Sequence, residues 1–235
     1  EMEPKDGNRG LVVLLCGIPG CGKDAIGRSC AKSLGGSALS QDEHNGNAAC
    51  TQNAFESMLA QQSSPIFVLR NGVDVGDRLP YVLAARRSGY RVTAVWPSEM
   101  KSPSHRPALF FASLAGCYGR LYDGGKSGHE TLTVDGHLQK PAQVCLNFLQ
   151  MFRAPSAPGE VDAVLSLSFL QSNLESTGNI SLTELGKGKV LPQAVQDVFD
   201  GDFDTVKTKM MAWGDIRRPV NDIANELVEW VTEQM

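Results

Sequence analysis

Several features that mark whole classes of protein are missing from this 235-residue sequence. It has no signal peptide and no apolar run of 18 residues, so neither secretion nor a membrane-spanning helix is expected. Its six cysteines form no C-x-x-C pair and have no regular spacing. We therefore expect reduced thiols in an intracellular protein, cytoplasmic or nuclear, with no membrane partner.

An excess of positive charge is also absent. Lysine and arginine total 22 residues against 26 aspartates and glutamates, which gives a net charge of −4 and a pI near 5.6. No global basic field draws the chain onto nucleic acid, and this argues against a non-specific nucleic-acid coat protein. The composition still allows an enzyme that holds one RNA end through a local cationic patch.

Short apolar runs alternate with helical patterns along most of the chain. Strands are predicted at residues 11–16, 37–41, 66–69, 91–96 and 163–167. Helices are predicted at residues 24–34, 48–62, 77–88, 106–120, 139–152, 193–199 and 219–233. The repeated strand–helix–strand order with short connections predicts an α/β fold, in which helices cover both faces of a doubly wound parallel sheet.

The segment between the first strand and the first helix is glycine-rich. It reads Gly17-Ile18-Pro19-Gly20-Cys21-Gly22-Lys23-Asp24 and fits the motif G-x-x-x-x-G-K-[ST] at every fixed position except the last. Backbone N–H groups in such a loop form an anion cradle, and the lysine adds a point charge for the β- and γ-phosphates. We therefore predict that residues 17–24 bind an NTP and that Lys23 is a catalytic cation.

Asp24 stands where this motif has a hydroxyl that binds Mg²⁺. A carboxylate also offers the oxygen ligands that Mg²⁺ prefers, so Asp24 is the predicted metal-site residue. The alternative is that Asp24 only stabilises the helix N-terminus through the helix dipole, an effect of about 0.3–1 kcal/mol. Both interpretations of Asp24 stay open from the sequence.

Polar residues follow the second and third predicted strands. Asp42 comes after the second strand, and Arg70 and Asn71 come after the third. Doubly wound folds bind ligands at the carboxyl ends of their strands. Asp42 is therefore predicted to orient an acceptor or take its proton, and Arg70 and Asn71 to bind the acceptor's phosphate or ribose. Leu69 holds the strand-end position where many P-loop enzymes carry a metal-shell aspartate.

A polar and glycine-rich stretch separates the fourth and fifth predicted strands. We expect a P-loop phosphotransferase of one domain over residues 1–235, with a core at about 11–97 and 138–235 and a lid insertion at about 98–137. Cations in a lid stabilise charge during phosphoryl transfer. Arg120 and Lys126 are the predicted catalytic residues of this region.

Four short motifs in chain order resemble a known group of enzymes. They are the phosphate loop, SQDE at residues 40–43, LRNGVDVGDRL at 69–79 and GGKSGHETL at 124–132. Over about residues 11–167 the sequence resembles the polynucleotide 5′-kinase domain of fungal-type tRNA ligases, which belongs with the phage polynucleotide kinase group. The resemblance implies an NTP donor (ATP or GTP) with Mg²⁺, an RNA 5′ end as acceptor, Asp42 as general base, and Lys126 in place of a lid arginine.

The beginning of the chain suggests a second resemblance. Glu1 before Met2 is typical of a cloning remnant, which would place this module at the start of its protein. In that position it resembles the amino-terminal RNA 5′-monophosphate kinase of trypanosome-type mRNA capping enzymes, which implies a downstream domain after Met235. Two alternatives stay open: a small-molecule or mononucleotide kinase, and a P-loop module that binds nucleotide without turnover.

Overall fold

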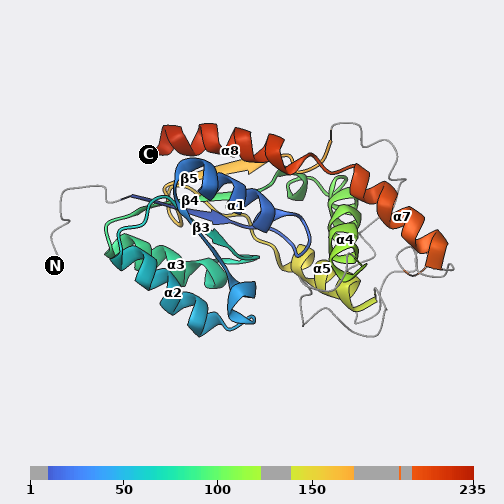
Figure 1. Ribbon diagram of the computed structural model, residues 1–235, viewed down its shortest axis with the longest axis horizontal. Coiled ribbons are helices and arrows are strands. Elements are labelled where there is room, and N and C mark those ends of the chain that lie inside the picture. Colours follow the sequence, from blue (N-terminus) through green and yellow to red (C-terminus); the bar gives the residue numbers. More distant parts are fainter. Residues whose placement is uncertain (1–9, 123–138, 172–195, 197–202) are drawn as a thin grey trace.

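A computed structural model describes residues 10–122, 139–171, 196 and 203–235 of the chain (Figure 1). Five strands within these residues form one parallel sheet in the order β2-β3-β1-β4-β5. Their bounds are β1 (Leu11–Leu15), β2 (Ser37–Ser40), β3 (Ile66–Leu69), β4 (Arg91–Pro97) and β5 (Ala163–Leu167). The α/β fold and all five predicted strands are confirmed, each strand to within one residue at either end.

Helices cover both faces of this sheet. One face carries α1 (Lys23–Leu34) and α8 (Val220–Gln234), and the other carries α2 (Ala48–Ala60) and α3 (Val75–Arg87) (Figure 1). Three helices lie beyond one end of the sheet: α4 (Arg106–Tyr122), α5 (Gln139–Met151) and α7 (Phe203–Asp215). Short 3₁₀ turns follow two strands: η1 (Gln41–His44) after β2 and η2 (Ser98–Met100) after β4.

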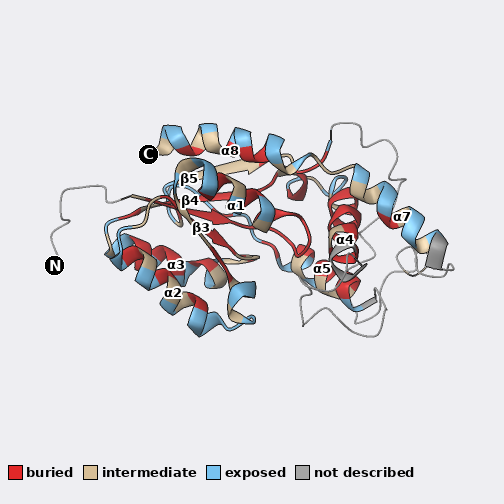
Figure 2. Ribbon diagram, in the orientation of Figure 1, coloured by how far each residue is buried: buried red, intermediate tan, exposed pale blue. Residues whose placement is uncertain are grey.

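The core lies on both sides of β1, the central strand. All five residues of β1 are buried, because β3 and β4 flank it and helices cover it above and below (Figure 2). This is why β1 is a continuous apolar run without alternation. On one face, Ile26 and Cys30 of α1 are buried with Leu227 of α8, and the Cys30 thiol donates a hydrogen bond to the carbonyl of Ala224.

The helices match the sequence less evenly than the strands. The predicted helices at 24–34, 48–62, 77–88, 106–120, 139–152 and 219–233 are confirmed with shifts of one or two residues at their ends. Helix α7 was not predicted. The helix predicted at 193–199 lies outside the described residues except for Gln196, which is helical. No helix in the described ranges has the length and apolar character that crossing a membrane requires.

The cysteines behave as the sequence suggests. All six lie in the described part of the chain and none forms a disulfide. Burial raises the pKa of Cys16 and of Cys30 to about 12, which keeps these two thiols protonated and unreactive near neutral pH.

Candidate active site

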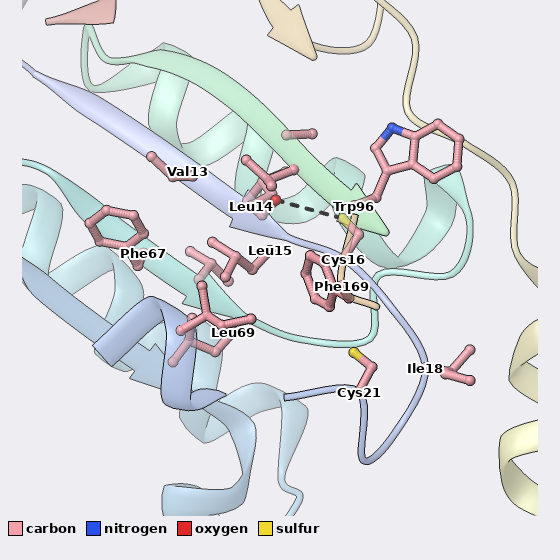
Figure 3. Packing of buried hydrophobic residues seen from close by; sticks show 14 of the residues in the cluster. Val13, Leu14, Leu15, Cys16, Ile18, Cys21, Phe67, Leu69, Trp96 and Phe169 are labelled. Carbon is pink, nitrogen blue, oxygen red and sulfur yellow. Dashed lines mark hydrogen bonds between the residues drawn. The ribbon is translucent and has the colours of Figure 1, made fainter. Parts of the chain in front are cut away.

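The phosphate loop leaves the sheet at the end of β1 and turns into α1 (Figure 3). Its first residues are tied to the two neighbouring strands: the N–H of Cys16 donates to the carbonyl of Val95 (2.8 Å), and the N–H of Gly17 donates to that of Asn71 (2.9 Å). Gly22 has φ 101° and caps the N-terminus of α1. The loop therefore lies at the carboxyl edge of the sheet, between β3 and β4, where its sequence predicted an anion cradle.

Lys23 is the first residue of α1 and is 92% buried, with a relative exposure of 8%. A buried lysine keeps its charge only where its surroundings compensate for lost hydration. At the N-terminus of a helix, phosphate oxygens supply that compensation together with the backbone N–H groups.

The loop packs directly against α4 and α5. A Cβ atom on Gly20 would overlap the carbonyl of Ser113, and one on Gly116 would overlap the carbonyl of Gly20. Glycine at both places lets the loop and α4 meet backbone to backbone. From α5, the Cys145 thiol donates a hydrogen bond to the carbonyl of Pro19 at 3.5 Å.

Asp24 points from the start of α1 to the end of β2. Its Oδ2 accepts a hydrogen bond from the Ser40 hydroxyl at 2.7 Å, and Ser40 is 1% exposed. The Ser40 oxygen in turn accepts from the N–H of Asp42 at 3.4 Å, and Glu43 completes a capping box with the N–H of Ser40. A continuous chain of hydrogen bonds therefore joins the phosphate loop to the turn that carries Asp42.

Asp42 and Asn71 lie at the ends of neighbouring strands, as predicted. Asp42 is exposed in η1 after β2, and Asn71 follows β3 and holds the loop through its main-chain carbonyl. Arg70 is half-buried: its Nη1 donates to the Tyr81 hydroxyl at 3.1 Å, and its guanidinium lies over the Tyr81 ring. Contact with α3 thus holds the Arg70 side chain at the carboxyl edge of the sheet.

Leu69 makes the end of β3 apolar. It is 2% exposed, and a Cβ atom on Gly27 of α1 would collide with its side chain. Leu69 is therefore a packing residue between β3 and α1. Within the described ranges, no three histidine, cysteine, aspartate or glutamate side chains gather as a metal site. Asp24 offers carboxylate oxygens, which suit Mg²⁺, whereas the hydroxyl of Ser40 is buried and engaged with Asp24 and with the N–H of Asp42.

The two predicted lid cations are not tested by the structure. Lys126 lies outside the described residues. Arg120 belongs to α4, but its side chain is also outside the described part of the chain.

Sequence reasoning missed one cation next to the loop. The guanidinium of Arg217, from the connection between α7 and α8, comes within 2.6 Å of where a Cβ on Gly22 would be. Burial raises the pKa of the Cys21 thiol, and the charges of Lys23 and Arg217 both act to lower it. The only sequence signal was an Arg-Arg-Pro run before the last helix, which says nothing about the segment that it reaches.

No protein-family model matches this sequence, and no curated protein matches it either. Similar solved structures include a fungal RNA kinase, a gluconokinase and a shikimate kinase. A fungal RNA kinase has a TM-score of 0.49 at 12% identity over 94% of this chain and 96% of its own. A gluconokinase from Sinorhizobium meliloti 1021 has a TM-score of 0.38 at 14% identity, over 94% of this chain and 97% of its own. A shikimate kinase from Bacteroides thetaiotaomicron has a TM-score of 0.39 at 13% identity, over 81% of this chain and 99% of its own.

The fold itself follows from this chain's own geometry. A parallel sheet has its first strand at the centre, and a glycine-rich loop from that strand opens a helix with a buried lysine. The chain therefore has an α/β fold in which a P-loop sequence opens the first helix at the carboxyl edge of a parallel sheet.

Proposed function

We propose that this protein is an RNA 5′-end kinase, which transfers the γ-phosphate of ATP or GTP to a 5′-monophosphate or 5′-hydroxyl end. One observation carries the kinase part: the phosphate loop with buried Lys23 lies at the sheet edge where β2 and β3 also end, beside Asp42 and Arg70. The residues proposed to bind the donor and the acceptor therefore lie along the same edge of the sheet. The motifs around residues 40–43, 69–79 and 124–132 support RNA as the acceptor.

In this proposal the residues have separate tasks. The loop and Lys23 hold the β- and γ-phosphates, and Asp42 orients the acceptor oxygen and accepts its proton where it carries one. That oxygen forms a bond to the γ-phosphorus as the bond to the β-phosphate oxygen breaks, and NDP leaves. Arg70 and Asn71 bind the acceptor's phosphate or ribose, and Arg120 and Lys126 close over the transfer.

Mg²⁺ would bind beside the loop at the carboxylate of Asp24. When bound, it neutralises charge on the donor phosphates. Which RNA end is the acceptor decides whether the protein acts in mRNA capping or in RNA repair and splicing. A downstream domain in the full-length protein belongs to the capping version of this proposal.

Labelled transfer tests the proposal directly. Protein and Mg²⁺ are mixed with γ-labelled ATP or GTP and short RNAs that end in 5′-hydroxyl, 5′-monophosphate or 5′-diphosphate. We expect label on one of the first two RNAs. Lys23→Ala should lower the rate at least 100-fold, because a charge that stabilises the transferring phosphoryl group is lost. Asp42→Ala should lower it about 10²–10⁴-fold on a hydroxyl end.

Lys32→Ala is the matched control, since Lys32 is exposed on the same helix α1 and far along it from the loop. Its rate should equal that of the unmodified protein. Label on the monophosphate RNA alone indicates preparation of ends for capping, whereas label on the hydroxyl RNA indicates repair or splicing. Transfer to no RNA contradicts the RNA part of the proposal.

A mononucleotide or other small molecule is the alternative acceptor. The net charge of −4 favours it, because a long RNA is attracted less by an acidic protein. The same assay with nucleoside monophosphates separates the two: a mononucleotide kinase labels these and leaves the RNAs unlabelled.

A further inference from the structure

Arg217 reaches the phosphate loop from a distant part of the chain. A Cβ atom on Gly22 would lie 2.6 Å from its Nη2, and one on Gly116 would lie 2.8 Å from its Nη1. The guanidinium therefore lies between the residue that caps α1 and the face of α4 that packs on the loop. Only glycine at position 22 leaves this space for it.

Main-chain hydrogen bonds hold this connection in place. Leu170 and Arg217 form an antiparallel bridge, and the N–H of Gln171 donates to the carbonyl of Ile216 at 2.8 Å. The segment after β5 and the segment before α8 thus run antiparallel and side by side at this bridge. The backbone at Arg217 is fixed to the sheet by this pairing.

Glu99 anchors the segment that follows β5. This carboxylate, 2% exposed in η2, accepts from the N–H groups of Phe169 and Leu170 at 2.9 and 3.0 Å and from the Ser168 hydroxyl at 2.7 Å. Bonds from backbone and hydroxyl donors to a buried carboxylate are among the stronger ones in proteins. The support behind Arg217 therefore extends to the end of β4.

Three sources of positive charge lie at the phosphate loop. The N-terminus of α1 carries the positive end of the helix dipole, Lys23 adds one charge, and Arg217 adds another. Burial raises the pKa of the Cys21 thiol in the loop, and both cations are close enough to act in the opposite direction. A planar guanidinium donates to two phosphate oxygens at once, whereas lysine acts as a point charge.

We propose that Arg217 binds phosphate groups of the donor nucleotide, opposite the cradle formed by the phosphate loop. This inference rests on the proposed function for the identity of the donor. It adds a cation from the connection between α7 and α8 to the lid cations, Arg120 and Lys126, that the sequence predicts. Since the phosphates are common to every NTP, Arg217 is expected to serve ATP and GTP equally.

Calorimetric binding of ATP, GTP and inorganic tripolyphosphate tests this role without any turnover. Arg217→Ala should weaken all three by the same factor, about 10- to 100-fold, because charge-assisted hydrogen bonds to phosphate are lost. Arg217→Lys should recover part of the affinity, since it keeps the charge but not the paired donors. If circular dichroism shows that Arg217→Ala is unstable, Arg217→Lys takes its place as the test variant.

Arg218→Ala is the matched control, because it removes the same charge one residue away. The Arg218 guanidinium donates to the carbonyl of Ser168 and to Glu226, so affinity should change less than about twofold. Equal affinities for Arg217→Ala and Arg218→Ala overturn the inference, as does a loss confined to one nucleotide with tripolyphosphate unchanged. Lys23→Ala separates the two proposals: undiminished ATP binding in that variant contradicts the proposed function itself.

Discussion

At the scale of single residues, Asp24 places a carboxylate where the P-loop motif has a hydroxyl, and this carboxylate pairs with Ser40. Ser40 lies at the end of β2. The pair still joins α1 to β2 through one short hydrogen bond. The carboxylate at position 24 therefore has a hydrogen-bond partner in Ser40.

A double-mutant cycle measures this pairing. Asp24→Ala and Ser40→Ala should each lower the free energy of unfolding by about 1–3 kcal/mol, because each leaves the other's polar group without its partner. The double variant should lose less than the sum, with a coupling energy of about 1–2 kcal/mol in urea unfolding. Strict additivity would mean that the 2.7 Å hydrogen bond contributes nothing to stability.

Whether Asp24 also binds metal is answered by binding rather than by stability. Asp24→Asn keeps an acceptor for Ser40 but removes the charge. If Mg²⁺ contacts this carboxylate, the increase in ATP affinity that Mg²⁺ brings to the unmodified protein should shrink in the variant. An unchanged increase would leave Asp24 with only its structural role.

At the scale of elements, the phosphate loop and α4 meet backbone to backbone. Gly20 and Gly116 let two backbones touch, and α4 lies within residues 98–137, the predicted lid insertion. A close-packed contact at this point couples the position of the loop to that of α4. The loop and α4 should therefore respond together to any change at their contact.

Gly116→Ala tests this contact. The added methyl group would overlap the carbonyl of Gly20, so we expect a loss of about 1–3 kcal/mol in stability and weaker ATP binding. Gly214→Ala in α7 is the control, because nothing lies within 4 Å of its Cβ and alanine favours a helix by about 0.8–1 kcal/mol. Thermal unfolding and calorimetry compare the two, and equal behaviour would contradict the role given to Gly116.

The same scale separates what the sequence predicts from what it does not. Strands and the phosphate loop were predicted because their signals are local: an apolar run of four or five residues, then glycines and Lys23. Helix α7 was missed although Phe203, Val206, Met210 and Trp213 have helical spacing, because the polar run Lys207-Thr208-Lys209 interrupts its apolar residues. Arg217 was missed because its contact is with Gly22, and no local pattern reports such a distant neighbour.

At the scale of the whole molecule, Arg78 connects segments that the sheet alone does not join. Its side chain, 1% exposed, forms a paired salt bridge with Glu160, just before β5. Its Nη1 also donates to the carbonyls of Gly72 and Arg153, at 2.7 and 2.9 Å. Helix α3, the turn after β3, the end of α5 and the approach to β5 therefore meet at one guanidinium.

Removing one partner of this pair should destabilise the whole domain. Glu160→Ala leaves the buried charge of Arg78 uncompensated, and we expect a loss of about 3–5 kcal/mol in the free energy of unfolding. Glu226→Ala, which breaks the exposed pair with Arg218, should cost at most about 1 kcal/mol. Urea titration of both variants measures the difference, and similar midpoints would refute the assignment of Arg78 as a buried connector.

The packing of α8 on α1 also has a consequence for how the protein is made. Cys30 and Ala224 touch across 194 residues of sequence, so the first helix of the fold is covered by the last. At about 5–20 residues per second, a ribosome takes roughly 10–40 s to synthesise the segment between them. During this interval the part of α1 that packs on α8 has no native cover, which makes the nascent chain a natural client of ribosome-associated chaperones.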